Sequence, residues 1–385
     1  MPLSTFKFRP GVNTEITAYS NEGGWNDCDK VRFRFGFPEK LGGWIKYSLN
    51  TFLGICRSLH AWIALDGSKF LGVGTHKKFY IVEGGAFNDI TPIRKTTTNA
   101  ATFAATNGST TITVTDSGHG AIVGDFVTFS GAATLGGNIT AAVLNIEYEI
   151  VTVPTANTYT ITTSVAANSS DSGNGGGSVV AKYQISVGID TVVPGTGWGA
   201  GTWGRGTWGS AATTVAGGGS IRIFSQDNFG EDLLFNIRDG SIYYWDRTNG
   251  LTTRAVELST LDSNAPTVAR KVLVSDRDRH VLVFGCNPIG SSTQDKLLIR
   301  FSSQENATDW LPSATNTAGD LVVGSGSQIV SVTETRREVF ILTDNSAHSL
   351  QFIGPPFTFG LTQISTGVTV LGPNAAVAAG DAVFW

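Results

Sequence analysis

The feature that most constrains the fold is a strand–turn–strand unit that recurs along the chain. Four segments share the order strand, polar turn, apolar strand, turn and aromatic strand: residues 59–82, 221–246, 271–301 and 329–353. Their middle strands are continuous apolar runs centred near Val73, Phe235, Val283 and Phe340. Such runs indicate burial on both faces. The turns carry Asp-Gly, Asn or paired charges, as antiparallel hairpins require.

The spacing of these units favours a β-propeller. The last three middle strands follow one another at intervals of roughly 50 residues, which suits one blade of four antiparallel strands. A tandem of immunoglobulin-like domains is the competing interpretation, but each of those domains needs roughly 100 residues. The chain has 47 glycines, one methionine and only 15% charged residues, so few windows favour a long helix. We therefore predict an all-β protein, a β-propeller with one inserted small β-sandwich or barrel domain.

The position of the inserted domain follows from a break in composition. The interval between Val73 and Phe235 is about a hundred residues too long for one blade. Within it, residues 96–181 contain no Lys and no Arg, whereas both flanks contain them. Short runs such as TTITVTD and GDFVTFSG alternate Thr with apolar residues, which is typical of half-buried strands. This tract is therefore expected to fold as a compact β domain of its own.

These observations divide the chain into five predicted regions. They are an N-terminal arm with the first propeller strands (1–55), a blade (56–95), the inserted β domain (96–184), a Gly/Trp-rich link (185–218) and further blades (219–385). The last blade is expected to be incomplete, because the final residues begin a new hairpin that stops at Trp385. On this interpretation the sequence is a piece of a longer protein.

The Gly/Trp-rich link contains the suspected interface residues. Trp198, Trp203 and Trp208 recur every five residues, and each is followed by glycine. This spacing matches neither one face of a helix nor one face of a strand. We expect the three rings to fill separate pockets, either within the chain or against a neighbouring subunit.

The sequence predicts no catalytic residue, no cofactor and no metal site. The histidines are scattered and form no metal-binding motif. Cys28, Cys56 and Cys286 are far apart, which argues against a disulfide framework or zinc and favours buried thiols. The net charge of −4 provides no basic field for nucleic acid. We therefore expect a protein that is not an enzyme.

Two local patterns come near known sites. Ser225, Asp227 and Gly230 approach the Asp box of sialidase-like propellers, but their spacing is off and no Trp follows. Asp276 and Asp278 suggest a calcium loop, but no Gly or later Glu completes it. The simpler interpretation of these aspartates is a hairpin tip of alternating charges.

Several motifs resemble one known family. They are GVNTEITAYSNEGGWNDCDKVRFRFGFPEKLGGW (residues 11–44), RFSSQENATDWLP (300–312), FIGPPFTFG (352–360), the Gly-Trp repeat and the terminal AVFW. Together they resemble the tail nozzle, or packaged-DNA stabilisation, proteins of short-tailed bacteriophages (podoviruses). The similarity touches both ends and most blades and is weakest in the insert.

The resemblance implies a β-propeller subunit of a homohexameric tube in the virion tail, made in the host cytoplasm. The tube would sit below the portal adaptor, retain the packaged genome and later conduct it out. Implied partners are further copies of the chain, the tail adaptor or connector, tail fibre or tail tip proteins, and genomic double-stranded DNA that passes without sequence-specific binding. A weakly acidic wall suits that passage, because it avoids the affinity that basic grooves gain from phosphates.

Two other functions remain open from the sequence. The first is a glycan-binding or glycan-cleaving tail propeller, since propellers often act on glycans. The second is a cellular propeller scaffold with no viral role. No paired acids for glycoside hydrolysis are identifiable in the sequence.

Overall fold

The computed structural model describes residues 8–43, 45–189 and 221–385. The chain forms two compact units, Met1–Leu49 and Asn50–Trp385. Trp198, Trp203 and Trp208 lie outside the described residues, so their assignment to an interface stays a prediction.

The first unit contains one hairpin. Strands β1 (Val31–Arg34) and β2 (Phe37–Lys40) form a two-stranded antiparallel sheet of their own. Phe35 and Gly36 both adopt positive φ, which is the geometry of a tight two-residue hairpin turn. The predicted first propeller strands within residues 1–55 are therefore a local hairpin, and the strands of the larger sheets begin at Cys56.

The second unit is built mainly from four antiparallel sheets of four strands each, with the strands in chain order. Sheet 1 contains β3 (Cys56–Ile63), β4 (Lys69–Thr75), β5 (Phe79–Glu83) and β6 (Ala86–Asp89). Sheet 2 contains β16 (Phe224–Phe229), β17 (Asp232–Ile237), β18 (Ile242–Trp245) and β19 (Val256–Glu257), with 3-10 turns at Arg247–Asn249 and Leu258–Thr260. Sheet 3 contains β20 (Lys271–Ser275), β21 (His280–Phe284), β22 (Leu298–Phe301) and β23 (Gly319–Val322). Sheet 4 contains β24 (Ile329–Glu334), β25 (Val339–Thr343), β26 (Ser346–Gly354) and β27 (Thr358–Thr366).

The predicted middle strands are confirmed as the second strands of these sheets. All residues of β21 and β25 are buried. Because side chains alternate across a strand, Leu234 of β17 packs towards sheet 3 while its neighbour Phe235 packs towards sheet 1. This explains why the second strands contain unbroken apolar runs rather than an alternation of apolar and polar residues.

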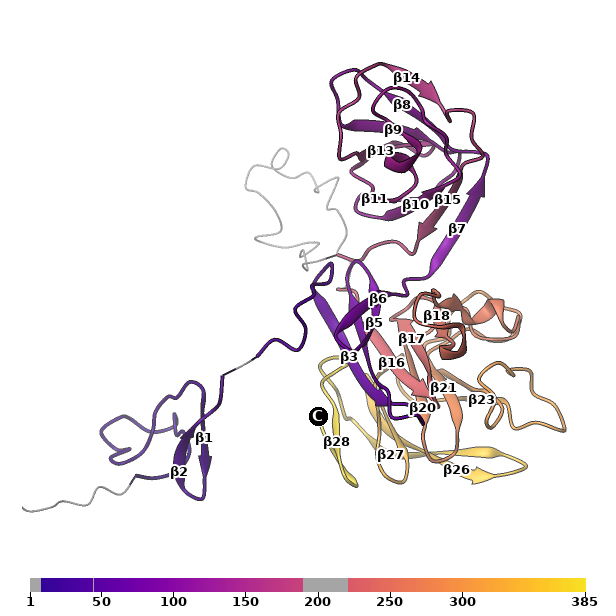
Figure 1. The fold of residues 1–385 in the computed structure, drawn as a ribbon. Coiled ribbons are helices and arrows are strands. Elements are labelled where there is room, and N and C mark those ends of the chain that lie inside the picture. The colour runs from indigo at the N-terminus through magenta and orange to yellow at the C-terminus, as the bar shows by residue number, and fades with distance from the viewer. Residues whose placement is uncertain (1–7, 44, 190–220) are drawn as a thin grey trace, which may run out of the picture. The chain divides into compact units, whose positions relative to one another are not determined.

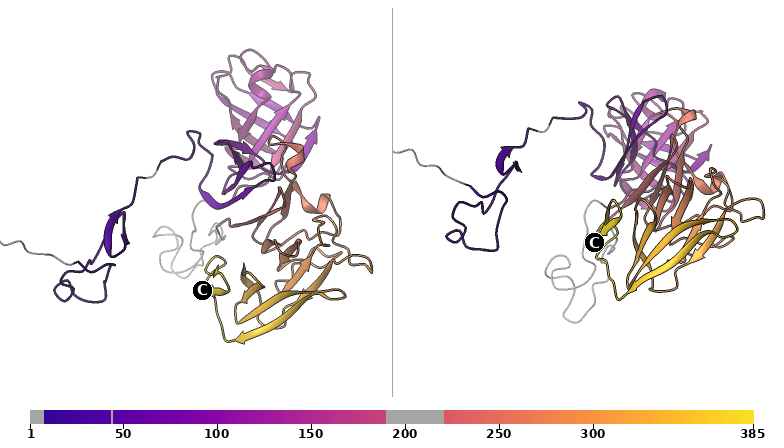
Figure 2. Two further views of the ribbon diagram at one scale, coloured as in Figure 1. Left: turned by 60° about the horizontal axis from the view of Figure 1, so that its bottom comes forward. Right: turned by 90° about the horizontal axis from the view of Figure 1, so that it is seen from below.

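The four sheets stack face to face in chain order (Figures 1 and 2). Between sheets 1 and 2, the rings of Phe79 and Phe235 stack with centroids 3.8 Å apart. Further cores join sheet 2 to sheet 3 and sheet 3 to sheet 4. A last hairpin, β28 (Val377–Ala379) and β29 (Ala382–Phe384), covers the outer face of sheet 4 with Val383. Stacked four-stranded sheets are the units of a propeller, but no closed ring is formed by the described residues, so the propeller remains a prediction.

The inserted domain is a β-sandwich, as predicted. One sheet has the order β11-β10-β15-β7 and the other has the order β12-β13-β9-β8-β14. The strands of the first sheet are β7 (Ile93–Thr98), β10 (Phe126–Ser130), β11 (Glu147–Glu149) and β15 (Val180–Gln184). The strands of the second sheet are β8 (Thr102–Ala105), β9 (Thr111–Thr115), β12 (Thr152–Thr155), β13 (Thr158–Thr162) and β14 (Asp171–Gly173).

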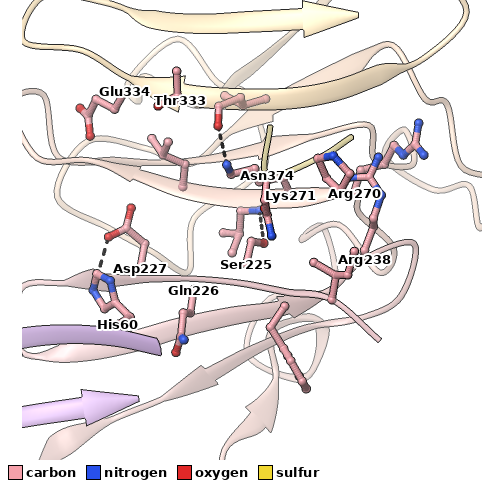
Figure 3. Close-up of a pocket in the computed structure, with 16 residues that line it drawn as sticks. His60, Ser225, Gln226, Asp227, Arg238, Arg270, Lys271, Thr333, Glu334 and Asn374 are labelled. Atoms are coloured by element: carbon pink, nitrogen blue, oxygen red, sulfur yellow. Dashed lines mark hydrogen bonds and ion pairs between the residues drawn. The ribbon is translucent and has the colours of Figure 1, made fainter. Parts of the chain in front are cut away.

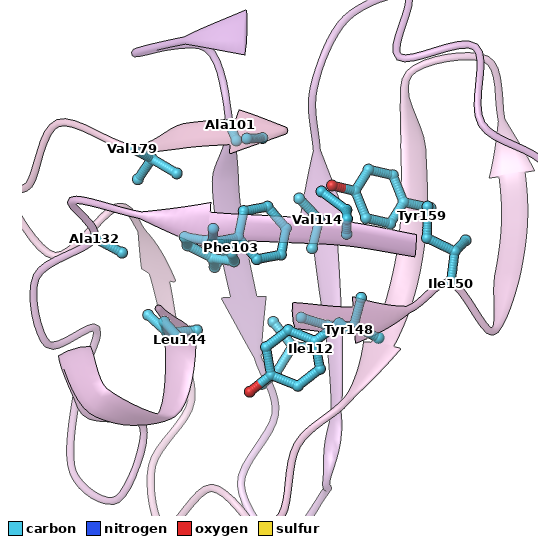
Figure 4. Packing of buried hydrophobic residues seen from close by; sticks show 14 of the residues in the cluster. Ala101, Phe103, Ile112, Val114, Ala132, Leu144, Tyr148, Ile150, Tyr159 and Val179 are labelled. Carbon is cyan, nitrogen blue, oxygen red and sulfur yellow. The ribbon is translucent and has the colours of Figure 1, made fainter. Parts of the chain in front are cut away.

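The sandwich encloses one apolar core between its two sheets. Phe103, Ile112, Phe129 and Tyr159 are among its fully buried members, and helix α1 (Ala141–Leu144) adds Leu144 (Figure 4). Strand β7 already begins at Ile93, ahead of the predicted boundary at residue 96. Its first residues belong to the sandwich because β7 pairs with β15 from Ile93 onward.

Candidate functional site

A cavity of about 370 Å³ lies where the first strands of the four sheets converge (Figure 3). It is lined by residues in or next to β3, β16, β17, β20 and β24, together with Pro373 and Asn374. In the predicted propeller, the first strands would surround the central channel. We call this cavity the axial cavity.

Side chains of β16 join the first strands around this cavity. The Ser225 Oγ accepts a hydrogen bond from the Val272 backbone N–H, and the Asp227 Oδ2 accepts one from Val274, both at 2.9 Å. Ser225 and Asp227 point the same way because they are two residues apart on a strand. They satisfy N–H groups on the edge of β20 that would otherwise lack partners.

One end of the axial cavity carries carboxyl groups. The His60 Nε2 lies 3.7 Å from the Asp227 Oδ1. Burial raises the pKa of Asp227, and the nearby Asp276 raises it further. Burial also raises the pKa of Glu334 to about 7, with contributions from Asp276 and Asp227. These carboxyl groups repel one another in a poorly solvated place.

The other end carries three cations (Figure 3). The Arg238 Nη1 donates to the Val330 carbonyl at 3.3 Å, and the Lys271 Nζ donates to the Val332 carbonyl. Burial lowers the pKa of Lys271 to about 8, against an opposing effect of Asp227. The third cation, Arg270, is buried. The axial cavity is therefore positive at one end and acidic at the other.

The near-match to an Asp box has a structural role in this fold. Ser225 and Asp227 line the axial cavity, but their oxygen atoms hold the backbone of β20. Gly230 lies in the turn between β16 and β17 with φ of 65°. These contacts assign no catalytic role to the three residues.

The other predictions about chemistry have mixed outcomes. Asp276 and Asp278 lie in the turn between β20 and β21, so the hairpin-tip interpretation is confirmed. Cys286 is buried, and burial raises the pKa of its thiol to about 12. The prediction of buried thiols is wrong for Cys56, which is exposed, and for Cys28, which is partly exposed. Both sit at or before the start of a strand, outside the stacked sheet faces.

No group of three or more His, Cys, Asp or Glu side chains in the described ranges could hold a metal ion. No helix in the same part of the chain is long and apolar enough to cross a membrane.

The sequence reasoning missed the charged axial cavity. Arg238 follows β17, Arg270 and Lys271 open β20, and Glu334 ends β24, so the charges come from three sheets. Only the pair Arg270–Lys271 before an apolar strand is a local signal, and such pairs are usually solvated. The other charged residues form a group only because the first strands of the sheets converge, and the sequence does not show that convergence.

Two of the segments that carry the family resemblance, 300–312 and 352–360, pack the sheets. The Arg300 guanidinium lies 5.9 Å from the centre of the Trp310 ring, and its Nη2 donates to the Trp310 carbonyl at 3.3 Å. Phe352 and Phe359 pack with ring centroids 5.6 Å apart beside His280. None of these residues lines the axial cavity.

The sheets define the fold class, an all-β protein of stacked sheets with an inserted sandwich, and comparisons with known proteins add no family to it. No family model matches the chain, and no curated protein matches it. The solved structures that match include the phage phi92 endosialidase, at 13% identity and a TM-score of 0.24. That match covers 82% of this chain and 48% of the endosialidase, so the chain spans about half the length of that protein. A similarity at this level assigns neither a family nor an activity.

Proposed function

We propose that this protein is a structural subunit of the tail of a short-tailed bacteriophage. Copies of the chain form a hexameric tube, the tail nozzle, which retains the packaged genome and then conducts it during ejection. The observation that carries the proposal is the family resemblance of residues 11–44, 300–312 and 352–360. The structure is consistent with a mechanical role, because Arg300, Trp310 and Phe359 act in packing.

The charge of the chain suits a conduit for DNA. Six copies at −4 each carry a formal charge of about −24, which repels phosphate along a channel wall. DNA then slides past without the affinity that counterion release gives to basic grooves. The proposal requires neither catalysis nor a cofactor.

The proposed partners follow from the position of a nozzle. Above it lies the adaptor ring of the portal, and beside or below it lie tail fibre or tip proteins. The proposed location is the virion tail, after synthesis in the host cytoplasm.

Genetic disruption in the encoding phage tests this function. We expect heads without this protein to package DNA and then lose it, and we expect the intact gene supplied in trans to restore DNA retention. DNA content of purified particles, measured after nuclease treatment, is the readout. Particles that keep their DNA without the protein would contradict the proposal.

A parallel assay separates the nozzle from the glycan alternative. Purified protein is incubated with host surface polysaccharide, and released reducing sugar is measured. The nozzle proposal predicts no release, whereas steady release would favour a glycan-cleaving tail component.

A further inference from the structure

Three cations converge at one end of the axial cavity from two different sheets. Arg238 lies just after β17 in sheet 2, Arg270 lies just before β20, and Lys271 is the first residue of β20 in sheet 3. Burial lowers the pKa of Arg238, and the charge of Arg270 lowers it further. Arg238 in turn opposes protonation of Lys271. All three side chains line the same cavity, so their positive charges share one poorly solvated space.

The described residues compensate these charges only in part. The Arg270 Nε lies 3.1 Å from the Asp239 Oδ1, and its Nη1 donates to the Gln328 Oε1 at 2.6 Å. Within the described ranges, Arg238 and Lys271 form no ion pair and instead donate to the carbonyl groups of Val330 and Val332. A carbonyl carries only a partial charge. A guanidinium has five N–H donors and an ammonium has three, so donors remain for a ligand.

The remainder of the cavity limits the size of that ligand. Its volume of about 370 Å³ accommodates a small ion with water. Asp227 and Glu334 at the opposite end would repel a polyanion that extended across the cavity. A compact ion can instead contact the cations while staying away from the carboxyl groups.

We propose that Arg238, Arg270 and Lys271 form a binding site for a small tetrahedral oxyanion of the phosphate class. Arginine matches such an ion with paired N–H donors, and lysine adds a point charge. Bound there, the ion would link sheets 2 and 3 to the edge of β24 across the axis. This site goes beyond the proposed nozzle function and does not depend on it.

Titration of the full chain with inorganic phosphate tests the site. Isothermal titration calorimetry at pH 7 and constant ionic strength, with chloride replaced by phosphate, is expected to show saturable binding. Arg238→Gln and Lys271→Gln should each weaken binding about tenfold or more, as loss of a charged hydrogen bond implies. Arg277→Gln is the matched control, because the Arg277 side chain is 67% exposed at the hairpin tip outside the axial cavity.

Thermal unfolding of each variant shows whether it is folded before the titration is interpreted. A short DNA duplex added to the phosphate-bound protein shows whether the site also accepts the phosphate groups of a DNA backbone. We expect the duplex not to displace the free ion. Absence of saturable phosphate binding would overturn the proposal. The proposal would also fail if folded Arg238→Gln and Lys271→Gln proteins both bound phosphate like wild type. It would fail as well if Arg277→Gln weakened binding equally, or if the duplex displaced phosphate.

Discussion

The inserted sandwich and the array of four sheets are both antiparallel, but they bury their apolar side chains in different places. The sandwich has one core, and every buried member of it lies between Ala101 and Tyr183. The array instead divides its core among the spaces between successive sheets. Each of its sheets therefore depends on its neighbours, whereas the sandwich completes its own core.

The two regions also place their polar groups differently. Inside the sandwich, the hydroxyl of Tyr183 donates to the Asp116 Oδ2 at 2.6 Å and lies 2.9 Å from the hydroxyl of Tyr159. In the array, one set of charged side chains, among them the buried Arg270, instead lines the axial cavity where the first strands meet. Buried polar groups thus pair with one another inside the sandwich and line a shared space in the array. The comparison predicts that damage in one region should be felt mainly there.

The largest expected effect is in the array. Phe235→Ala removes a fully buried ring that stacks on Phe79 between sheets 1 and 2. Its loss should cost about 3–5 kcal/mol in the free energy of unfolding of the array. Denaturant unfolding monitored by circular dichroism measures this loss, and calorimetry assigns it to the array or the sandwich. Phe357→Ala is the control, because the Phe357 ring is 74% exposed. Equal destabilisation of the sandwich would contradict the division into two cores.

The next effect tests the junction between the regions. Glu147 of β11 accepts a hydrogen bond from the Lys78 Nζ of sheet 1 and lies 3.4 Å from the Arg254 Nη2 of sheet 2. Glu147→Gln removes this charge from beside a buried lysine and should weaken the coupling of sandwich and array by about 2 kcal/mol. We expect the calorimetric unfolding transition of the sandwich and that of the array to move apart in temperature.

The neighbouring ion pair provides the control for that junction. Glu149 pairs with Lys77 at 2.8 Å, but its side chain is 46% exposed. Glu149→Gln should change stability by less than about 0.5 kcal/mol because exposed pairs are screened by solvent. If both variants behaved alike, the junction would not depend on the buried pair.

A smaller effect is confined to the sandwich. Tyr183→Phe removes the donor to Asp116 and should cost about 1–2 kcal/mol, because a buried carboxylate loses a hydrogen bond. The sandwich transition should shift while the array transition stays in place. Thr111→Val on the exposed sheet face is the control, with a change expected within about 0.5 kcal/mol. A shift of the array transition would show that the two regions share one core.

The smallest effect depends on pH and belongs to the array. Because the pKa of Glu334 is raised from 4.5 to about 7, the folded chain keeps a proton that the unfolded chain releases between these values. Its contribution to stability is complete below pH 4.5 and is lost as the pH rises through 7. Glu334→Gln should reduce this loss by about 1 kcal/mol, since the carboxyl is partly solvated. Parallel pH curves for wild type and variant would contradict the assignment.

The array and the sandwich also differ in how much of their strand structure the sequence predicts. The second strands were predictable because Val283 and Phe340 sit in unbroken apolar runs. The fourth strands were missed, since a strand such as β19 has only two residues and partly exposed side chains. The lack of Lys and Arg predicts the sandwich as a separate domain. Its individual strands are harder to predict, because two of them lie in the single run EYEIVTV. That run leaves one sheet after Glu149 and enters the other at Thr152.

The candidate site was less predictable than either fold. Its charges come from residues such as Arg238 and Glu334, which are far apart in sequence and meet only when the sheets converge. A single hairpin pattern does not fix the angle between successive sheets. The sequence therefore predicted the blade units but not the axial cavity between them.

The mass of the assembled particle tests the central claim of a tail nozzle most directly. The full chain is mixed with its portal-adaptor complex, and native mass spectrometry measures what assembles. Six copies of the 40.6 kDa chain on each adaptor ring is the predicted result, expected from the resemblance to nozzle proteins. A chain that stays monomeric in the presence of the adaptor complex would contradict the account.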